Sequence, residues 1–169
     1  IPEHVRSIRV SDTVGLNAMC RLHWPQLTYL SLYDNELKTI DVSPLTQLTD
    51  LHLDRNELKT IDVSPLTQLT DLNLGSNELK TIDVSPLTQL TDLRLYHNEL
   101  KTIDVSPLTE LRFLRLDGNR FNTSVPTAVR NNTHLRCLNL RNNRFFGGME
   151  WLQDMPDLRW LDVRHNTLQ

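Results

Sequence analysis

The sequence predicts a curved, right-handed solenoid in which short strands stack into a parallel β-sheet of about seven or eight strands. Two observations support this fold class. A 21-residue unit recurs almost verbatim in three consecutive copies, Leu45–Pro65, Leu66–Pro86 and Leu87–Pro107. Within each copy, leucines alternate with a changing residue, which places the leucines on one face of a strand and the changing residue on the other. We expect the sheet to line the concave side of the array.

The unit extends beyond the three near-identical copies. Its core, L-x-x-L-x-L-x-x-N-x-L, recurs at steps of 21, 21, 21, 21, 24 and 23 residues. The strand leucines are Leu30, Leu51, Leu72, Leu93, Leu114, Leu138 and Leu161. The asparagines are Asn35, Asn56, Asn77, Asn98, Asn119, Asn143 and Asn166. We expect the leucines to form continuous apolar columns and the asparagines to form a ladder that satisfies backbone groups of the turns.

This spacing resembles the leucine-rich repeat family over nearly the whole chain. The 21-residue units are similar to short bacterial, internalin-type repeats. The stretch from Asn119 to Pro126 resembles the 24-residue plant-type unit. The resemblance implies a single leucine-rich repeat domain over residues 1–169. Within it we expect a degenerate N-terminal capping unit at 1–26, regular repeats at 27–107 and irregular repeats at 108–169, with a C-terminal cap missing.

Two local features complete the predicted unit. Val5, Ile8 and Val10 align with Leu27, Leu30 and Leu32 and indicate a degenerate first strand. The segment Thr-Ile-Asp-Val-Ser-Pro between strands carries β-branched residues and a proline, which disfavour a helix. We therefore expect the convex side of the 21-residue units to be extended or 3₁₀ rather than α-helical.

Charge is distributed unevenly along the chain. Residues 1–107 hold nine Lys and Arg against fifteen Asp and Glu, whereas residues 108–169 hold nine Arg against six acids. This dipole favours a partner of complementary charge. The net charge of −3 argues against nucleic acid as that partner. No apolar run reaches the ~20 residues that span a bilayer, so no membrane insertion is expected.

The two cysteines lie too far apart in the predicted register to form a disulfide. Cys20 precedes the second strand and Cys137 lies on the seventh. Five strand spacings of about 4.8 Å exceed the ~7 Å between Cα atoms that a disulfide tolerates. Cys137 is either a reactive thiol or, as we favour, an inert and partly shielded one.

Variation between the three near-identical copies is confined to three positions. These are His52/Asn73/Arg94, Asp54/Gly75/Tyr96 and Arg55/Ser76/His97, all on the second half of the strand or its exit. Neutral drift would also change other exposed positions, yet the Glu57, Lys59 and Asp62 positions are identical in all copies. We therefore favour diversification for binding over drift.

A ligand-binding surface is predicted on the concave face. Tyr, Trp and Arg on a rigid sheet are residue types enriched in binding hot spots. The predicted residues are Tyr29, Tyr33, His52, Asp54, Arg55, Asn73, Arg94, Tyr96, His97, Phe113, Arg115, Asp117, Asn139, Arg141, Trp160, Asp162 and Arg164.

A row of three carboxylates, Asp50, Asp71 and Asp92, is predicted on the same face. At about 4.8 Å spacing they repel one another, so they either bind a cation, receive a basic partner or are tolerated as a surface row, which we favour. His52, His97 and His165 are not on adjacent units, so no metal site is predicted. Two glycosylation sequons begin at Asn122 and Asn131, and they matter only in a eukaryotic secretory pathway.

No phosphate loop, zinc spacing or nucleophile elbow is present in the sequence, so neither an enzyme nor a cofactor is predicted. The leading hypothesis is a monomeric protein-recognition module, secreted or at a cell surface, that binds a host receptor or surface protein. A cytoplasmic location is the alternative. Two other functions remain open: a structural spacer or adhesin stalk, and the recognition arm of a larger effector or receptor.

Overall fold

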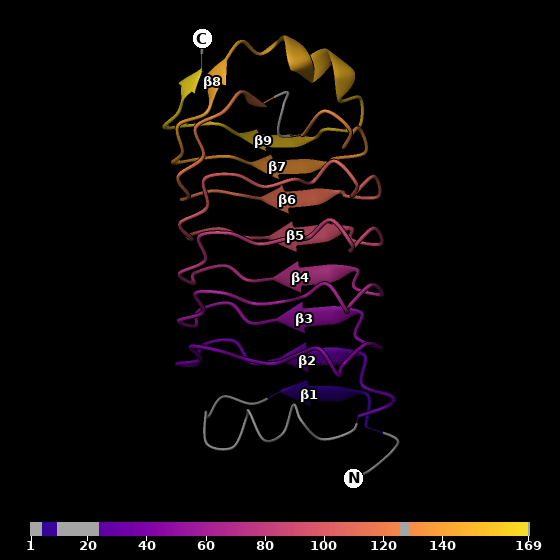
Figure 1. The fold of residues 1–169 in the computed structure, drawn as a ribbon. Coiled ribbons are helices and arrows are strands. Elements are labelled where there is room, and N and C mark those ends of the chain that lie inside the picture. The colour runs from indigo at the N-terminus through magenta and orange to yellow at the C-terminus, as the bar shows by residue number, and fades with distance from the viewer. Residues whose placement is uncertain (1–4, 10–23, 126–128, 169) are drawn as a thin grey trace.

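The fold is a stack of similar turns that share one parallel sheet (Figure 1). The structure is a computed structural model that describes residues 5–9, 24–125 and 129–168. Eight strands follow one another in chain order: β1 (Ser7–Arg9), β2 (Tyr29–Ser31), β3 (Asp50–His52), β4 (Asp71–Asn73), β5 (Asp92–Arg94), β6 (Phe113–Arg115), β7 (Cys137–Asn139) and β9 (Trp160–Asp162). The predicted leucine-rich repeat solenoid is confirmed.

The register of the sheet is the one that the leucine spacing predicts. Leu30 pairs with Leu51, Leu51 with Leu72, and the same pairing continues to Leu161. Ile8 pairs with Leu30, which confirms the degenerate first strand, although Val10 and Cys20 lie outside the described residues. The strand leucines from Leu30 to Leu138 are fully buried. Each contributes about 1.5–3 kcal/mol of hydrophobic stabilisation, so the columns are the main source of stability.

The predicted asparagine ladder is present. Asn77 is representative: its Nδ2 donates to the carbonyls of Leu53 at 3.0 Å and Leu74 at 3.1 Å, and its Oδ1 accepts the Leu58 N–H at 3.0 Å. One side chain thus bridges two neighbouring turns and satisfies backbone groups of both. The equivalent bonds continue to Asn166 at the last turn.

A second ladder, of threonines, was not predicted. The hydroxyls of Thr49, Thr70 and Thr91 each donate to the carbonyl of the preceding threonine at 3.1 Å. These residues lie just before β3, β4 and β5, at the edge where the strands begin. The ladder adds one side-chain bond per turn beside the main-chain bonds of the sheet.

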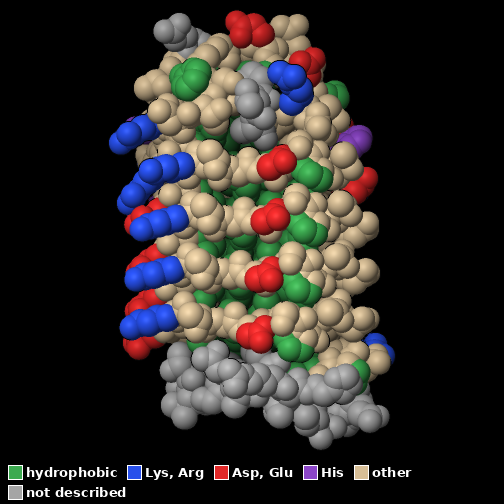
Figure 2. All heavy atoms as spheres, viewed as in Figure 1, with side chains coloured by type: hydrophobic (Ala, Val, Ile, Leu, Met, Phe, Trp, Pro, Cys, Tyr) green, Lys and Arg blue, Asp and Glu red, His purple; other side chains and the backbone are tan. Residues whose placement is uncertain are grey.

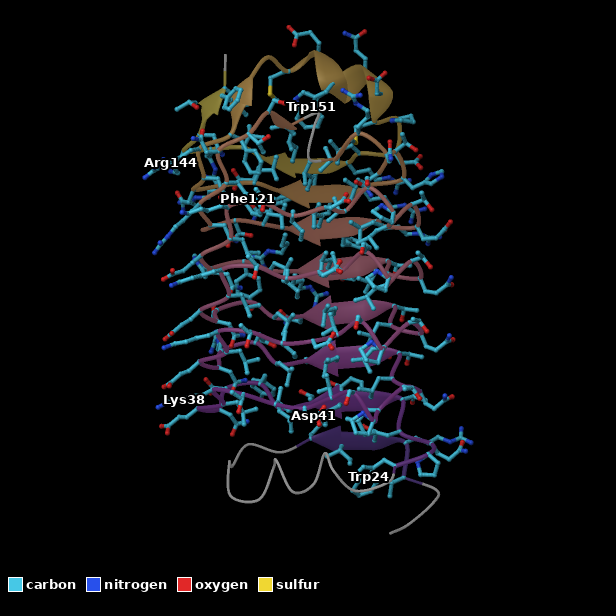
Figure 3. The ribbon with its side chains drawn as sticks, viewed as in Figure 1. Trp24, Lys38, Asp41, Phe121, Arg144 and Trp151 are labelled. Carbon is cyan, nitrogen blue, oxygen red and sulfur yellow. The ribbon has the colours of Figure 1, made fainter. Side chains whose placement is uncertain are left out.

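The convex segments of the regular units contain no helix, as predicted. Each is held by an aspartate that accepts two bonds from the serine two residues later; Asp62 Oδ1 accepts the Ser64 N–H at 3.0 Å and its hydroxyl at 2.7 Å. These bonds lower the pKa of Asp62 below its usual value. Figure 2 shows the resulting column of acidic side chains along this face, with basic side chains along one edge. Figure 3 places Asp41 in that column and Lys38 on that edge.

The longer C-terminal units carry structure that the sequence did not predict. A second, two-stranded parallel sheet pairs β8 (Phe146–Gly147) with β10 (Thr167–Leu168). A 3₁₀ helix, η1 (Glu150–Asp154), buries Trp151 near the C-terminal end (Figure 3). Inside these units Phe121 and Phe145 stack with ring centroids 5.4 Å apart. The longer units therefore differ from the regular ones by a second sheet, a 3₁₀ helix and a stacked aromatic pair.

Candidate recognition surface

The concave face consists of side chains that flank the buried leucines on the side of the sheet away from the core. All seventeen predicted residues lie within the described part of the chain, on the strands or just after them. Among the large hydrophobic side chains described, only four are exposed: Tyr33 at 54%, Phe113 at 44%, Trp160 at 48% and Phe146 at 46%. Three of these four belong to the predicted surface. The exposed apolar area is therefore concentrated on the face that the sequence singled out.

Four of the predicted residues are buried: Asn73, Asp117, Asn139 and Asp162. Three of them occupy the same strand position and do the same local work. Asn73 and Asn139 each accept the backbone N–H two residues later at 3.2 Å, and Asp162 accepts that of Arg164 at 3.1 Å. These bonds hold the strand exit in place and thereby fix the position of the neighbouring side chains.

The varied residues contact one another across turns. Asn73 Nδ2 donates to Asp54 Oδ1 at 2.9 Å. The Tyr96 ring lies over Gly75, where an added Cβ would sit 2.2 Å from the ring. The Arg115 guanidinium lies 4.5 Å from the Tyr96 centroid, a cation–π contact.

Arg115 extends this chain of contacts by one more residue. Its Nε and Nη2 donate to Asp117 at 3.2 and 3.1 Å. We call this set the varied network: Asp54, Asn73, Gly75, Tyr96, Arg115 and Asp117. The varied network spans four turns, and each of its residues contacts a residue of the same or the next turn, so a substitution in one turn alters a contact with its neighbour. Gly75, absent from the predicted set, is the residue that makes room for Tyr96.

The third varied position has a left-handed backbone in each of the seven units from β2 to β9, which the sequence did not reveal. The residues are Asp34, Arg55, Ser76, His97, Asn142 and His165, with φ between 50° and 59°, and Gly118 with φ 67°. A side chain in this region costs roughly 1 kcal/mol relative to glycine. Six of the seven units nevertheless keep a side chain there, which supports a role for these side chains outside folding. Gly118 also leaves space for the His97 ring, because an added Cβ would lie 2.3 Å from it.

Two members of the acidic row, Asp71 and Asp92, contact basic side chains of the same face. His52 Nε2 lies 3.3 Å from Asp71 Oδ1, and Arg94 forms ion pairs with both Asp92 and Asp71. The contact with Asp71 raises the pKa of His52, although partial burial opposes it. Burial raises the pKa of Asp92 despite its pair with Arg94. Among the described residues no group of three or more His, Cys, Asp or Glu is placed to hold a metal ion.

The C-terminal half of the concave face is apolar at its first position. Phe113, Cys137 and Trp160 pair in register on β6, β7 and β9, so they lie side by side. Burial raises the pKa of the Cys137 thiol, which disfavours the reactive thiolate. Just before them stand three exposed arginines, Arg112, Arg136 and Arg159, which the sequence analysis missed. The sequence does contain a signal for them, because they occupy the repeat position that carries Thr28, Thr49, Thr70 and Thr91 in the regular units.

Comparison with known proteins gives consistent results. A family model described as leucine rich repeat matches residues 67–121 and 109–168. A leucine-rich repeat protein from Leptospira interrogans is 25% identical and covers 98% of this chain and 44% of its own, with a TM-score of 0.87. An internalin (inlF) from Listeria monocytogenes is 26% identical and covers 99% of this chain and 57% of its own, with a TM-score of 0.69.

A third similar structure comes from a plant. The leucine-rich repeat ectodomain of the Arabidopsis thaliana membrane receptor kinase GASSHO1/SCHENGEN3, solved in complex with Casparian strip integrity factor 2, is 27% identical. It covers 84% of this chain and 22% of its own, with a TM-score of 0.63. The chain thus spans less than two thirds of each of these proteins. No match was found among curated protein sequences. No helix in the described residues is long and apolar enough to cross a membrane.

Proposed function

Because the chain belongs to the leucine-rich repeat family, we propose that it is a protein-recognition module that binds a protein ligand through its concave face. The observation that carries this proposal is the exposure of Tyr33, Phe113 and Trp160 on or next to a sheet whose leucines on the other face are fully buried from Leu30 to Leu138. Exposed aromatic side chains on a rigid support are typical anchors of protein interfaces. Phe113 and Trp160 lie on strands rather than loops, which lowers the entropy lost on binding.

Specificity, in this proposal, comes from the varied network. Tyr96 is held between Gly75 below and Arg115 above, so its ring is already ordered before a ligand arrives. Exposed neighbours such as Arg55 and His97 add polar contacts around it. Because network residues fit one another across turns, a new specificity requires coordinated changes in adjacent units.

The likeness to an internalin and to a receptor ectodomain solved with its ligand supports a secreted or cell-surface location in this proposal. The ligand we propose is a surface protein, for example a host receptor. The recognition role requires no catalytic group, and the described concave residues are arranged in contacts with one another rather than around a reactive centre.

The test is a binding assay with exposed aromatic residues removed one at a time. Immobilised wild-type protein would capture ligands from a library of purified surface-protein ectodomains, and affinities would then be measured by biolayer interferometry. Phe113→Ala and Trp160→Ala should each weaken binding about tenfold or more, a loss typical of hot-spot residues. Phe146→Ala is the matched control, because Phe146 is equally exposed but lies on β8, outside the main sheet. Equal losses at Phe113 and Phe146 would contradict the proposal.

A spacer or stalk is the second candidate function, and the uniform convex columns of the regular units favour it. The Asp–Ser contacts repeat at Asp41, Asp62, Asp83 and Asp104 with almost unchanged geometry. Deletion of residues 66–86 removes one complete unit and preserves the repeat register. A spacer would keep its function after this deletion, whereas a recognition surface would lose the contact between Gly75 and Tyr96 and its ligand affinity.

A further inference from the structure

Three arginines replace the threonine ladder in the last three turns of the main sheet. The backbone N–H of Arg112 donates to the Thr91 carbonyl at 2.9 Å, that of Arg136 to Arg112 at 2.8 Å, and that of Arg159 to Arg136 at 2.9 Å. These are the bonds that Thr49, Thr70 and Thr91 make in the regular units at 2.8 to 2.9 Å. The arginine row, defined as Arg112, Arg136 and Arg159, therefore occupies one edge of the sheet at about 4.8 Å spacing.

The side chains of the arginine row are exposed and form no ion pair with the described residues. Within the described residues none of its members forms an ion pair, whereas Arg115, Arg120 and Arg164 pair with Asp117, Glu99 and Asp162. Three like charges this close repel one another, and the threonines they replace would have supplied a stabilising bond. Folding therefore gives no reason for the row, which points to a ligand.

Each arginine directly precedes one of three apolar residues that lie side by side on the sheet, Phe113, Cys137 and Trp160. Arg112 precedes Phe113 and Arg159 precedes Trp160, whose side chains are exposed at 44% and 48%. The same half of the concave face carries Arg141, which forms no ion pair among the described residues and whose Nε is buried without a hydrogen-bond partner. A row of cationic side chains thus lies beside a row of apolar ones, at the end of the array where arginine exceeds acidic residues.

We infer that the arginine row and the adjacent Phe113 and Trp160 bind an acidic, extended segment of the protein partner. This inference rests on the proposed function and adds the chemistry of the ligand. Guanidinium groups bind carboxylates in a planar, often bidentate geometry. In an extended segment successive side chains point to opposite sides, so acidic residues can face the arginine row while alternate apolar residues face the aromatic rings.

Discrete carboxylates fit this edge better than a continuous chain of phosphates. Glu110 and Asp157 line a small recess with Arg112 and Arg136, and Asp157 holds His134 at 3.3 Å. These two carboxylates lower the positive electrostatic potential at points along the arginine row. A nucleic acid, which has a negative charge at every nucleotide, would lie against them, whereas a peptide can place neutral residues there.

The chain provides the variant that tests the inference. In Arg112→Thr/Arg136→Thr/Arg159→Thr, each arginine becomes the residue that regular units carry at the same position, so the fold is expected to persist. The matched control is Lys59→Thr/Lys80→Thr/Lys101→Thr, which removes the same charge from exposed side chains on the convex flank. Thermal unfolding of both variants checks that the array remains folded.

The probes are two synthetic extended peptides that differ only in charge. One alternates glutamate with leucine and phenylalanine, and the other carries glutamine at every glutamate position. Fluorescence anisotropy should show that the wild type prefers the acidic peptide by roughly tenfold or more, with the preference falling as salt increases. The arginine variant should lose this preference and the lysine control should keep it.

Three outcomes would overturn the inference. The wild type could bind neither peptide or bind them equally; both triple variants could lose the preference alike, which would reflect net charge only; or single-stranded RNA could displace the acidic peptide and bind more tightly. The Phe113→Ala and Trp160→Ala variants separate this result from the proposed function. Loss of captured ligand in those variants, with no effect of the arginine variant, would keep concave recognition and remove its acidic specificity.

Discussion

The regular units at 27–107 and the longer units at 108–169 share one sheet but use its edge differently. In the regular units threonine hydroxyls stabilise the edge, and two residues of the acidic row beside them, Asp71 and Asp92, contact His52 and Arg94. In the longer units the same edge carries arginines that form no ion pair with any described residue, and the acidic row is replaced by Phe113, Cys137 and Trp160. The asparagine ladder is continuous through both.

The difference shows which parts of a repeat are available to change. The leucines and asparagines face the core or bridge turns, so both regions keep them. Residues at the edge and on the concave face can be substituted, because a different side chain there leaves the main-chain hydrogen bonds of the sheet intact. The regular region uses this freedom for contacts within the protein, and the C-terminal region leaves charge and aromatic surface free.

Removal of one rung of the asparagine ladder should have the largest effect. Asn77→Ala deletes the bonds to two carbonyls and leaves the buried Leu58 N–H unsatisfied, so we expect a loss of about 3 kcal/mol in the free energy of unfolding. Asn166→Ala removes the equivalent bonds in the last turn, where the side chain is only partly buried, and should cost clearly less. Urea unfolding measures both. Equal losses would mean that the ladder is no more important inside the array than at its end.

The fit between Gly75 and Tyr96 is the next test, because the longer units carry Asp117, Arg141 and Arg164 at this position and have no such gap. Gly75→Ala places a methyl group in the Tyr96 ring and should cost roughly 1–3 kcal/mol by overpacking. In a Tyr96→Ala background the same substitution should cost much less. A double-mutant cycle by urea unfolding measures this coupling. Additive effects would show that the varied positions are independent.

The smallest expected effect is the pH dependence of the His52–Asp71 pair, which exists only in the regular region. Asp71 raises the pKa of His52 above the ordinary value of 6.5 in the folded protein. The native state therefore binds the His52 proton more tightly than the unfolded chain does. The resulting stabilisation of the folded protein is complete below pH 6.5 and is lost as the pH rises through the folded pKa. The Tm of the wild type should fall over this range more than that of His52→Asn, which carries the residue found at position 73. Parallel pH profiles would contradict the ion pair.

Much of this architecture was predictable because the repeat makes each position visible several times. The spacing of Leu30, Leu51 and Leu72 fixed the register, and Thr-Ile-Asp-Val-Ser-Pro excluded a helix from the convex side. The small sheet of β8 and β10 was not predictable, because it pairs segments about twenty residues apart that contain no strand pattern of their own. The buried state of Asn73 and Asp117 also depends on neighbours in adjacent turns.

The sequence alone determined the solenoid, the parallel register, the leucine core and the asparagine ladder, because local periodicity and burial of one face leave no other arrangement for identical units. It also located the face on which residues vary. Only the tertiary structure decided which of those residues are free. Stacking at a spacing of about 4.8 Å brings Tyr96 onto Gly75 and Arg115 onto Tyr96. It gives Arg112, Arg136 and Arg159 no ion-pair partner among the described residues, since contacts between turns depend on the side chains of each neighbouring turn.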